Sequence, residues 1–159
     1  REFLLELLRQ CKEAGIQTAI ETAGNYAWEW LEEMLPHTDL VMHDLKILAP
    51  ELHEKFVGND GERIRSNFLR LAETGKPLIV RTPVIGGVND TVEEIGGIAR
   101  FIGGIESLLY YELLPYHPLG ESKRESLGQT AEDRFYTPDK EKMSELADVA
   151  RAFVGEVRP

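Results

Sequence analysis

The sequence predicts an α/β fold built on a parallel β-sheet, and three observations support this prediction. Segments rich in β-branched and aliphatic residues alternate with segments whose apolar residues recur at helical spacing. Helical segments separate each predicted strand from the next, which is the connection that parallel neighbours require. The chain has 159 residues and no low-complexity segment or linker, so a single domain over residues 1–159 is expected.

A helix opens the chain, and four strand–helix units follow it. In the first helix Phe3, Leu4, Leu7 and Leu8 recur at helical spacing, and Gly15 ends it. The strands are predicted at residues 16–22, 38–48, 77–83 and 107–114. The later helices are predicted at residues 26–35, 50–56, 64–74, 91–102 and 139–154, with a long irregular segment at 115–138.

Composition narrows the classes of function. The net charge of −10 argues against broad binding to nucleic acid or to anionic membranes, and no apolar run is long enough to span a bilayer. Cys11 is the single cysteine, so an intracellular, cytoplasmic origin is expected and this chain cannot hold an iron–sulfur cluster or a structural zinc ion by itself. His37 and His53 lack partners at metal-binding spacing and are expected at the surface.

The stretch 38–48, TDLVMHDLKIL, carries a charged pair at the end of an apolar strand. Successive side chains of a strand point to opposite faces, so Met42, Asp44 and Lys46 share one face. His43 lies on the other face and is expected to pack against the helix layer. A buried acid and base are costly unless they are paired or used, so a structural ion pair and a binding site remain equal alternatives here.

Each of the four predicted strands has a polar residue near its carboxyl end, where parallel α/β folds place their chemistry. A rim of acids, bases and an imidazole suits a zwitterionic ligand, and two carboxylates could also bind a hard cation. Taken singly, Arg81 could simply pair with Asp44, and His117 could be a surface histidine. The residues of this predicted rim are Glu21, Thr22, Asp44, Lys46, Arg81 and His117.

Five segments resemble a known family in order and spacing. They are GIQTAIETAGN (15–25), TDLVMHDLKIL (38–48), HEKFVGNDGERIRSNFLRLAETG (53–75), VRTPVIGGVND (80–90) and ELLPYHPLGESK (112–123). Together they are similar to the carboxyl-terminal two-thirds of glycyl-radical-enzyme activating enzymes of the pyruvate formate-lyase activating enzyme type, in the radical S-adenosylmethionine (SAM) superfamily. The resemblance covers nearly the whole chain.

The resemblance implies a truncated, partial (β/α) TIM-type barrel with about four parallel strands, lacking the first βα units. It implies an oxidoreductase that binds SAM and a [4Fe–4S] cluster at the carboxyl ends of its strands. The reduced cluster gives an electron to SAM, and the resulting 5′-deoxyadenosyl radical takes hydrogen from a glycine of a glycyl-radical enzyme. That enzyme is the expected partner, and the full-length parent is expected to be a monomer.

By the same resemblance, Lys46, Arg81 and His117 are expected to contact SAM, and Glu21 and Asp44 to form the acidic part of the site. In the family these two acids, with the main-chain carbonyls at the positions of Thr22 and Met42, are implicated in a monovalent cation site. Asp44 and Lys46 match the family's D-x-K, and His117 matches its L-P-Y-H histidine.

The sequence departs from the family in two motifs, because it contains neither C-x3-C-x2-C nor G-G-E. We therefore expect a fragment that does not cleave SAM alone. Strand 16–22 is expected at an edge of the sheet, where the chain could self-associate. Two alternatives stay open: a small lyase or aldolase with Lys46 as a Schiff-base amine, and a non-catalytic ligand-binding module.

Overall fold

The structure is a computed structural model that describes residues 1–117 and 135–159. Most of the irregular segment predicted at 115–138 lies outside the described residues. The described elements are α1 (Glu2–Glu13), β1 (Ala19–Thr22), α2 (Trp28–Met34), η1 (Leu35–His37), β2 (Leu40–Asp44), α3 (Pro50–Val57), α4 (Glu62–Glu73), β3 (Leu78–Val84), α5 (Val92–Ile102), β4 (Leu108–Pro115), α7 (Lys140–Arg151) and β5 (Val157–Arg158). No helix among these residues is long and apolar enough to cross a bilayer.

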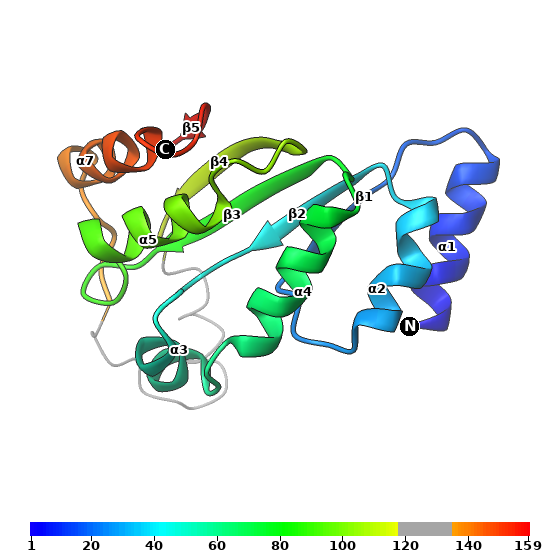
Figure 1. The fold of residues 1–159 in the computed structure, drawn as a ribbon, viewed down its shortest axis with the longest axis horizontal. Helices are drawn as coiled ribbons and strands as arrows, with labels where there is room; N and C mark the ends of the chain where they lie inside the picture. The colour runs from blue at the N-terminus through cyan, green and yellow to red at the C-terminus, as the bar shows by residue number, and fades with distance from the viewer. Residues whose placement is uncertain (118–134) are drawn as a thin grey trace.

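The sheet has five strands in the order β1-β2-β3-β4-β5, and all neighbouring pairs are parallel (Figure 1). This confirms the α/β prediction and the edge position of β1. Self-association through that edge stays a prediction. The fifth strand was not predicted, because Val157–Arg158 is too short to show a periodic pattern. Strand β1 begins at Ala19, three residues later than expected.

The two faces of the sheet differ, and this difference positions the site. Along β2 and β3 buried residues alternate with partly exposed ones, as Val41, Val80 and Thr82 do with Asp44 and Arg81. The buried side chains belong to the core shared with the helices, which is where strands of a parallel sheet bury apolar residues. Asp44 and Arg81 therefore lie on the face that the core does not cover.

The predicted position of His43 is confirmed. Its side chain is only 1% exposed, and its ring packs edge-on against Phe68 of α4, with 5.2 Å between the ring centroids. Burial in this apolar setting lowers the pKa of His43 to about 4, because the charged imidazolium is disfavoured there. His43 thus belongs to the core and not to the charged face.

One local prediction was wrong. His53 was expected at the surface but is only 3% exposed, because the 58–61 turn folds back over α3 and the carbonyl of Asn59 lies 2.6 Å from His53 Nδ1. His37 is half-buried. Helix α2 starts after Ala27 and has no side-chain cap. Helix α5 is capped by Thr91, whose hydroxyl accepts from Glu94 N at 3.1 Å.

Candidate functional site

Asp44 and Arg81 form the centre of the candidate site. They are register partners on β2 and β3, and parallel register places their side chains next to each other on the same face. Arg81 Nη2 donates to Asp44 Oδ1 at 2.9 Å and Nε donates to the same oxygen at 3.2 Å. Arg81 lies within β3, which continues to Val84, and not at the strand end that the sequence suggested.

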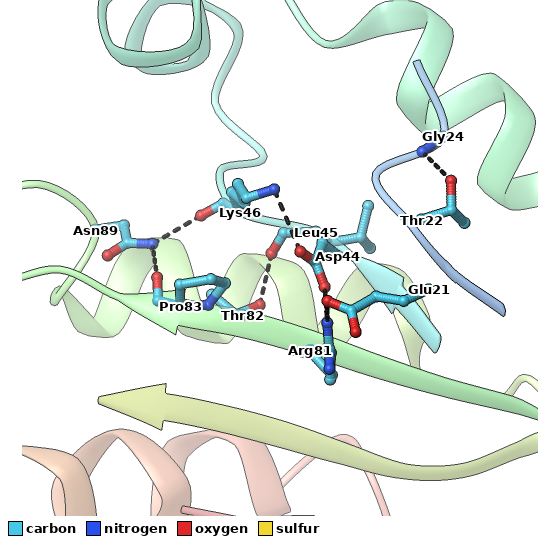
Figure 2. Close-up of polar contacts among 10 residues, drawn as sticks. All are labelled: Glu21, Thr22, Gly24, Asp44, Leu45, Lys46, Arg81, Thr82, Pro83 and Asn89. Carbon is cyan, nitrogen blue, oxygen red and sulfur yellow. Dashed lines mark hydrogen bonds and ion pairs between the residues drawn. The ribbon is translucent and has the colours of Figure 1, made fainter. Parts of the chain in front are cut away.

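Two more predicted residues complete the ion-paired cluster, which consists of Glu21, Asp44, Lys46 and Arg81 (Figure 2). Lys46 Nζ lies 3.3 Å from Asp44 Oδ2, and the Glu21 carboxylate binds the Arg81 guanidinium. The side chains of Asp44 and Arg81 are 15% and 14% exposed, whereas those of Glu21 and Lys46 are 57% and 40% exposed. The centre is thus sheltered, and its outer members are open to a ligand.

The electrostatics of the cluster favour a permanent cation at Arg81. Partial burial by itself would lower the pKa of Arg81, but the hydrogen bonds to Glu21 and Asp44 outweigh it and raise the pKa above its usual value. The ion pair that the sequence left open as an alternative is therefore present. A ligand carboxylate would compete with Asp44 and Glu21 for this guanidinium.

The remaining predicted site residues are Thr22, Met42 and His117. Thr22 follows Glu21 at the end of β1, where its hydroxyl donates to Tyr26 Oη at 2.8 Å and accepts from Gly24 N at 3.0 Å. Met42 is the register partner of Glu21. His117 follows the end of β4 and is exposed, and within the described part of the chain no hydrogen bond or ion pair joins it to the cluster.

The segment after β2 is held by residues that the sequence reasoning did not single out. Leu45 N still donates to Arg81 O at 3.0 Å, but side chains hold the chain from there on. Thr82 Oγ1 donates to Leu45 O at 2.6 Å, and Asn89 Nδ2 donates to Lys46 O at 2.7 Å and to Pro83 O at 2.9 Å (Figure 2). The only sequence signal for Asn89 was its place in the matched segment VIGGVND.

The charged residues do not form a transition-metal site. Across residues 1–117 and 135–159, no group of three or more His, Cys, Asp or Glu side chains is arranged to hold a metal ion. Cys11 is the only cysteine of the chain and lies on α1. The expected monovalent cation between Glu21 and Asp44 would have to share both carboxylates with Arg81, which already binds them.

Relatives of the chain share one type of activity. It is 41% identical over 129 residues to the isethionate sulfite-lyase activating enzyme of Desulfovibrio desulfuricans, a match that covers 80% of the chain and 41% of that protein. It is 39% identical over 147 residues to the pyruvate formate-lyase-activating enzyme of Clostridium pasteurianum, covering 91% of the chain and 61% of the relative. This chain is homologous to the glycyl-radical-enzyme activating enzymes. It spans about half the length of the curated activating enzymes that it matches.

Solved structures agree with this homology. A crystallised domain of a pyruvate-formate lyase-activating enzyme from Bacteroides vulgatus superposes with a TM-score of 0.81 and 27% identity, covering 98% of this chain and 88% of that one. A radical SAM methyltransferase from Sphaerobacter thermophilus has the same fold, with a TM-score of 0.61 at 18% identity, covering 92% of this chain and 41% of the methyltransferase. No protein-family model matches the chain. The partial-barrel fold that the resemblance implied is confirmed.

Proposed function

We propose that this chain forms the SAM-binding part of a radical SAM activating enzyme, which generates a glycyl radical on a partner enzyme. The observation that carries the proposal is the ion-paired cluster, in which two carboxylates and two cations lie on adjacent strands or just after them. The methionine end of SAM carries an ammonium and a carboxylate, and such a zwitterion needs opposite charges close together. Homology to activating enzymes supports the same function.

In this proposal Lys46 and Arg81 bind the ligand carboxylate. The planar guanidinium of Arg81 can hold a carboxylate with two parallel hydrogen bonds, and the half-exposed ammonium of Lys46 supplies a point charge. Both cations bind Asp44 in the structure, so the incoming carboxylate takes over part of their hydrogen bonding. His117 makes a further ligand contact beyond the end of β4.

The same exchange frees Asp44 for a cation. Once the ligand carboxylate occupies Arg81 and Lys46, Asp44 and Glu21 offer oxygen ligands to a monovalent cation, together with the main-chain carbonyls of Thr22 and Met42. Oxygen atoms are what a hard cation prefers. A cation at this position would also neutralise the two carboxylates next to the bound zwitterion.

The iron–sulfur part of the reaction does not fit this chain. SAM supplies radical chemistry only when a reduced [4Fe–4S] cluster lies next to it, and a single cysteine cannot hold such a cluster. The chain's own contribution is therefore to bind and orient SAM. We place the cluster ligands in the part of the activating enzymes that this chain does not span.

Three related ligands test the proposed site by isothermal titration calorimetry on the 159-residue chain. SAM and S-adenosylhomocysteine carry the same amino-acid zwitterion, so both are expected to bind. Methylthioadenosine has the nucleoside but no zwitterion, so its affinity is expected to be at least about tenfold lower. Equal binding of all three ligands, or no saturable binding of SAM, would contradict the proposed site.

Two matched lysine variants test whether SAM binds at the ion-paired cluster. Lys46→Met is expected to weaken SAM binding, because it removes a charge from the cluster. Lys55→Met removes an exposed charge on α3 and is expected to leave binding unchanged. If both variants bind SAM as the wild type does, Lys46 has no ligand role and the ion pair is purely structural.

The alternative of a Schiff-base lyase or aldolase gains no support from the geometry. Lys46 Nζ lies 3.3 Å from a carboxylate oxygen of Asp44, which is the arrangement of an ion pair and not of a free amine nucleophile. Borohydride trapping of a carbonyl substrate on Lys46 would reverse this conclusion. In the third alternative, a non-catalytic ligand- or partner-binding module, the charged residues at the strand ends merely pair with one another.

A further inference from the structure

Lys46 lies outside the sheet, yet its segment is fixed in place. Strand β2 ends at Asp44, and the last backbone bond to β3 is from Leu45 N to Arg81 O at 3.0 Å. In the described part of the chain, no backbone–backbone hydrogen bond joins residues 46–48 to another element. A loop segment without such bonds is ordinarily mobile. Something other than the sheet must therefore hold Lys46 next to Asp44.

Side chains from three later parts of the chain replace the missing backbone bonds. Thr82 of β3 donates to Leu45 O at 2.6 Å, and Asn89, in the loop before α5, donates to Lys46 O at 2.7 Å. The carboxylate of Glu94 on α5 accepts from Leu48 N and from Ala49 N, the latter at 3.3 Å. We call Thr82, Asn89 and Glu94 the brace.

All three members of the brace are buried, and the side chains of Thr82 and Asn89 are themselves held by further hydrogen bonds. Thr82 is fully buried, and its hydroxyl also accepts from Tyr111 Oη at 2.8 Å. Asn89 is 1% exposed, and its side-chain oxygen accepts from Ile85 N at 2.7 Å. Buried polar groups of this kind are costly unless all their hydrogen bonds form, so they specify one arrangement of the segment.

We propose that the brace positions Lys46 for ligand binding, so that Thr82, Asn89 and Glu94 are positioning residues of the candidate site. They act on the backbone at residues 45–49, and within the described part of the chain no hydrogen bond joins their side chains to a charged group of the ion-paired cluster. The site therefore depends on β3 and α5 as well as on the strand that carries the charges. The ligand-binding role of Lys46 rests on the proposed function, but the positioning of its side chain beside Asp44 does not.

A pair of isosteric variants separates positioning from stability. Thr82→Val removes the hydroxyl that binds Leu45 O at the carboxyl end of β2. Thr38→Val removes an equally buried hydroxyl, which donates to Met34 O at 2.9 Å, near the amino end of the same strand. Thr82→Ser retains the hydroxyl and should behave as the wild type. Asn89→Ala provides a second variant that acts directly on Lys46 O.

The readout is the rate at which acetic anhydride labels Lys46 in the unliganded chain, measured by mass spectrometry. Loss of the contact with Asp44 is expected to raise this rate by about two- to five-fold in Thr82→Val and Asn89→Ala. Thr82→Ser and Thr38→Val are expected to match the wild type. Lys76, whose ammonium binds Thr38 O at 2.7 Å, reports general opening of the fold in the same sample.

Two outcomes overturn the brace. The first is that Lys46 is labelled by acetic anhydride at the wild-type rate in both Thr82→Val and Asn89→Ala. The second is a parallel rise of the Lys46 and Lys76 rates, which would show only a loss of stability. Calorimetry with SAM is the separate test of function: Thr82→Val should weaken SAM binding by a similar factor, and Thr82→Ser should restore it. If wild-type chain does not bind SAM but the labelling pattern holds, the proposed function fails and the brace stands.

Discussion

Asp44 uses both of its carboxylate oxygens for cations in the unliganded structure. Arg81 binds Oδ1 at 2.9 Å through Nη2, and Lys46 approaches Oδ2 at 3.3 Å. A ligand carboxylate at this site must therefore displace part of an existing ion pair. Loss of an interaction with Asp44 offsets some of the gain from the new one, so discrimination depends on how well the ligand matches both cations.

The first prediction concerns the contribution of this pair to stability. Asp44→Asn keeps the shape of the side chain but removes its charge. Among the described residues, the exposed Glu21 is then the one remaining anionic partner of the sheltered Arg81. The free energy of unfolding is expected to fall by about 1–3 kcal/mol, because a sheltered charge-assisted hydrogen bond is lost. Urea denaturation followed by circular dichroism measures the change.

Asp148→Asn is the control for this variant. Asp148 pairs with Arg151 one helical turn away, and its side chain is 70% exposed. Solvent screens such a pair, so the free energy of unfolding should change by less than about 0.5 kcal/mol. If Asp44→Asn and Asp148→Asn lower the free energy of unfolding equally, partial burial does not strengthen the ion pair of Asp44.

Much of the fold was predictable because helices and parallel strands carry regular apolar patterns. The alternation in β2 correctly placed His43 in the core and Asp44 on the opposite face. Strand β5 was not predictable in this way, since Val157 and Arg158 are too few residues to show a period. The burial of His53 depends on a turn that folds back over α3, which is a tertiary contact that no local pattern encodes.

The charged residues of the site could be predicted from the sequence. The side chains that hold the segment after β2 in place could not. An acid and a base at the end of an apolar strand stand out in a sequence, and Asp44, Lys46 and Arg81 did come together. Asn89 and Thr82 have common polar side chains, and apart from their place in the matched segment 80–90 nothing in the sequence around them marks them as part of a site. Their proposed role depends on which backbone carbonyls lie opposite them in the folded chain, and no local sequence pattern encodes this.

The second prediction concerns the close approach of Gly24 to His43. Gly24 has a φ of +70°, and a Cβ atom there would lie 2.5 Å from His43 Nε2. Gly24→Ala is expected to lower the free energy of unfolding by about 1–2 kcal/mol through the positive φ, and by about 1–3 kcal/mol more through the clash. The clash should be relieved in the Gly24→Ala/His43→Ala double variant, and denaturant unfolding of the four proteins forms a double-mutant cycle.

Gly15 gives the matched control for the backbone part of this effect. Its φ is +72°, and no atom lies within 4 Å of the position that a Cβ would take. Gly15→Ala should therefore show only the conformational cost of about 1–2 kcal/mol. If Gly24→Ala is no worse than Gly15→Ala, or if the cycle shows no coupling with His43, the close approach has no energetic consequence.

The last prediction concerns the pH dependence of stability. Burial lowers the pKa of His43 to about 4, below the value of about 6.5 expected in the unfolded chain, so the unfolded state takes up the proton first as the pH falls. The native state should lose up to about 3 kcal/mol from this group between pH 6.5 and pH 4. His43→Leu removes the group. Because neither ring nitrogen of His43 has a hydrogen-bond partner among the described residues, the variant should also be more stable near pH 7. Urea denaturation of both proteins at pH 7, 6, 5 and 4 should show the advantage of His43→Leu growing as the pH falls, and a constant difference would refute the role of His43.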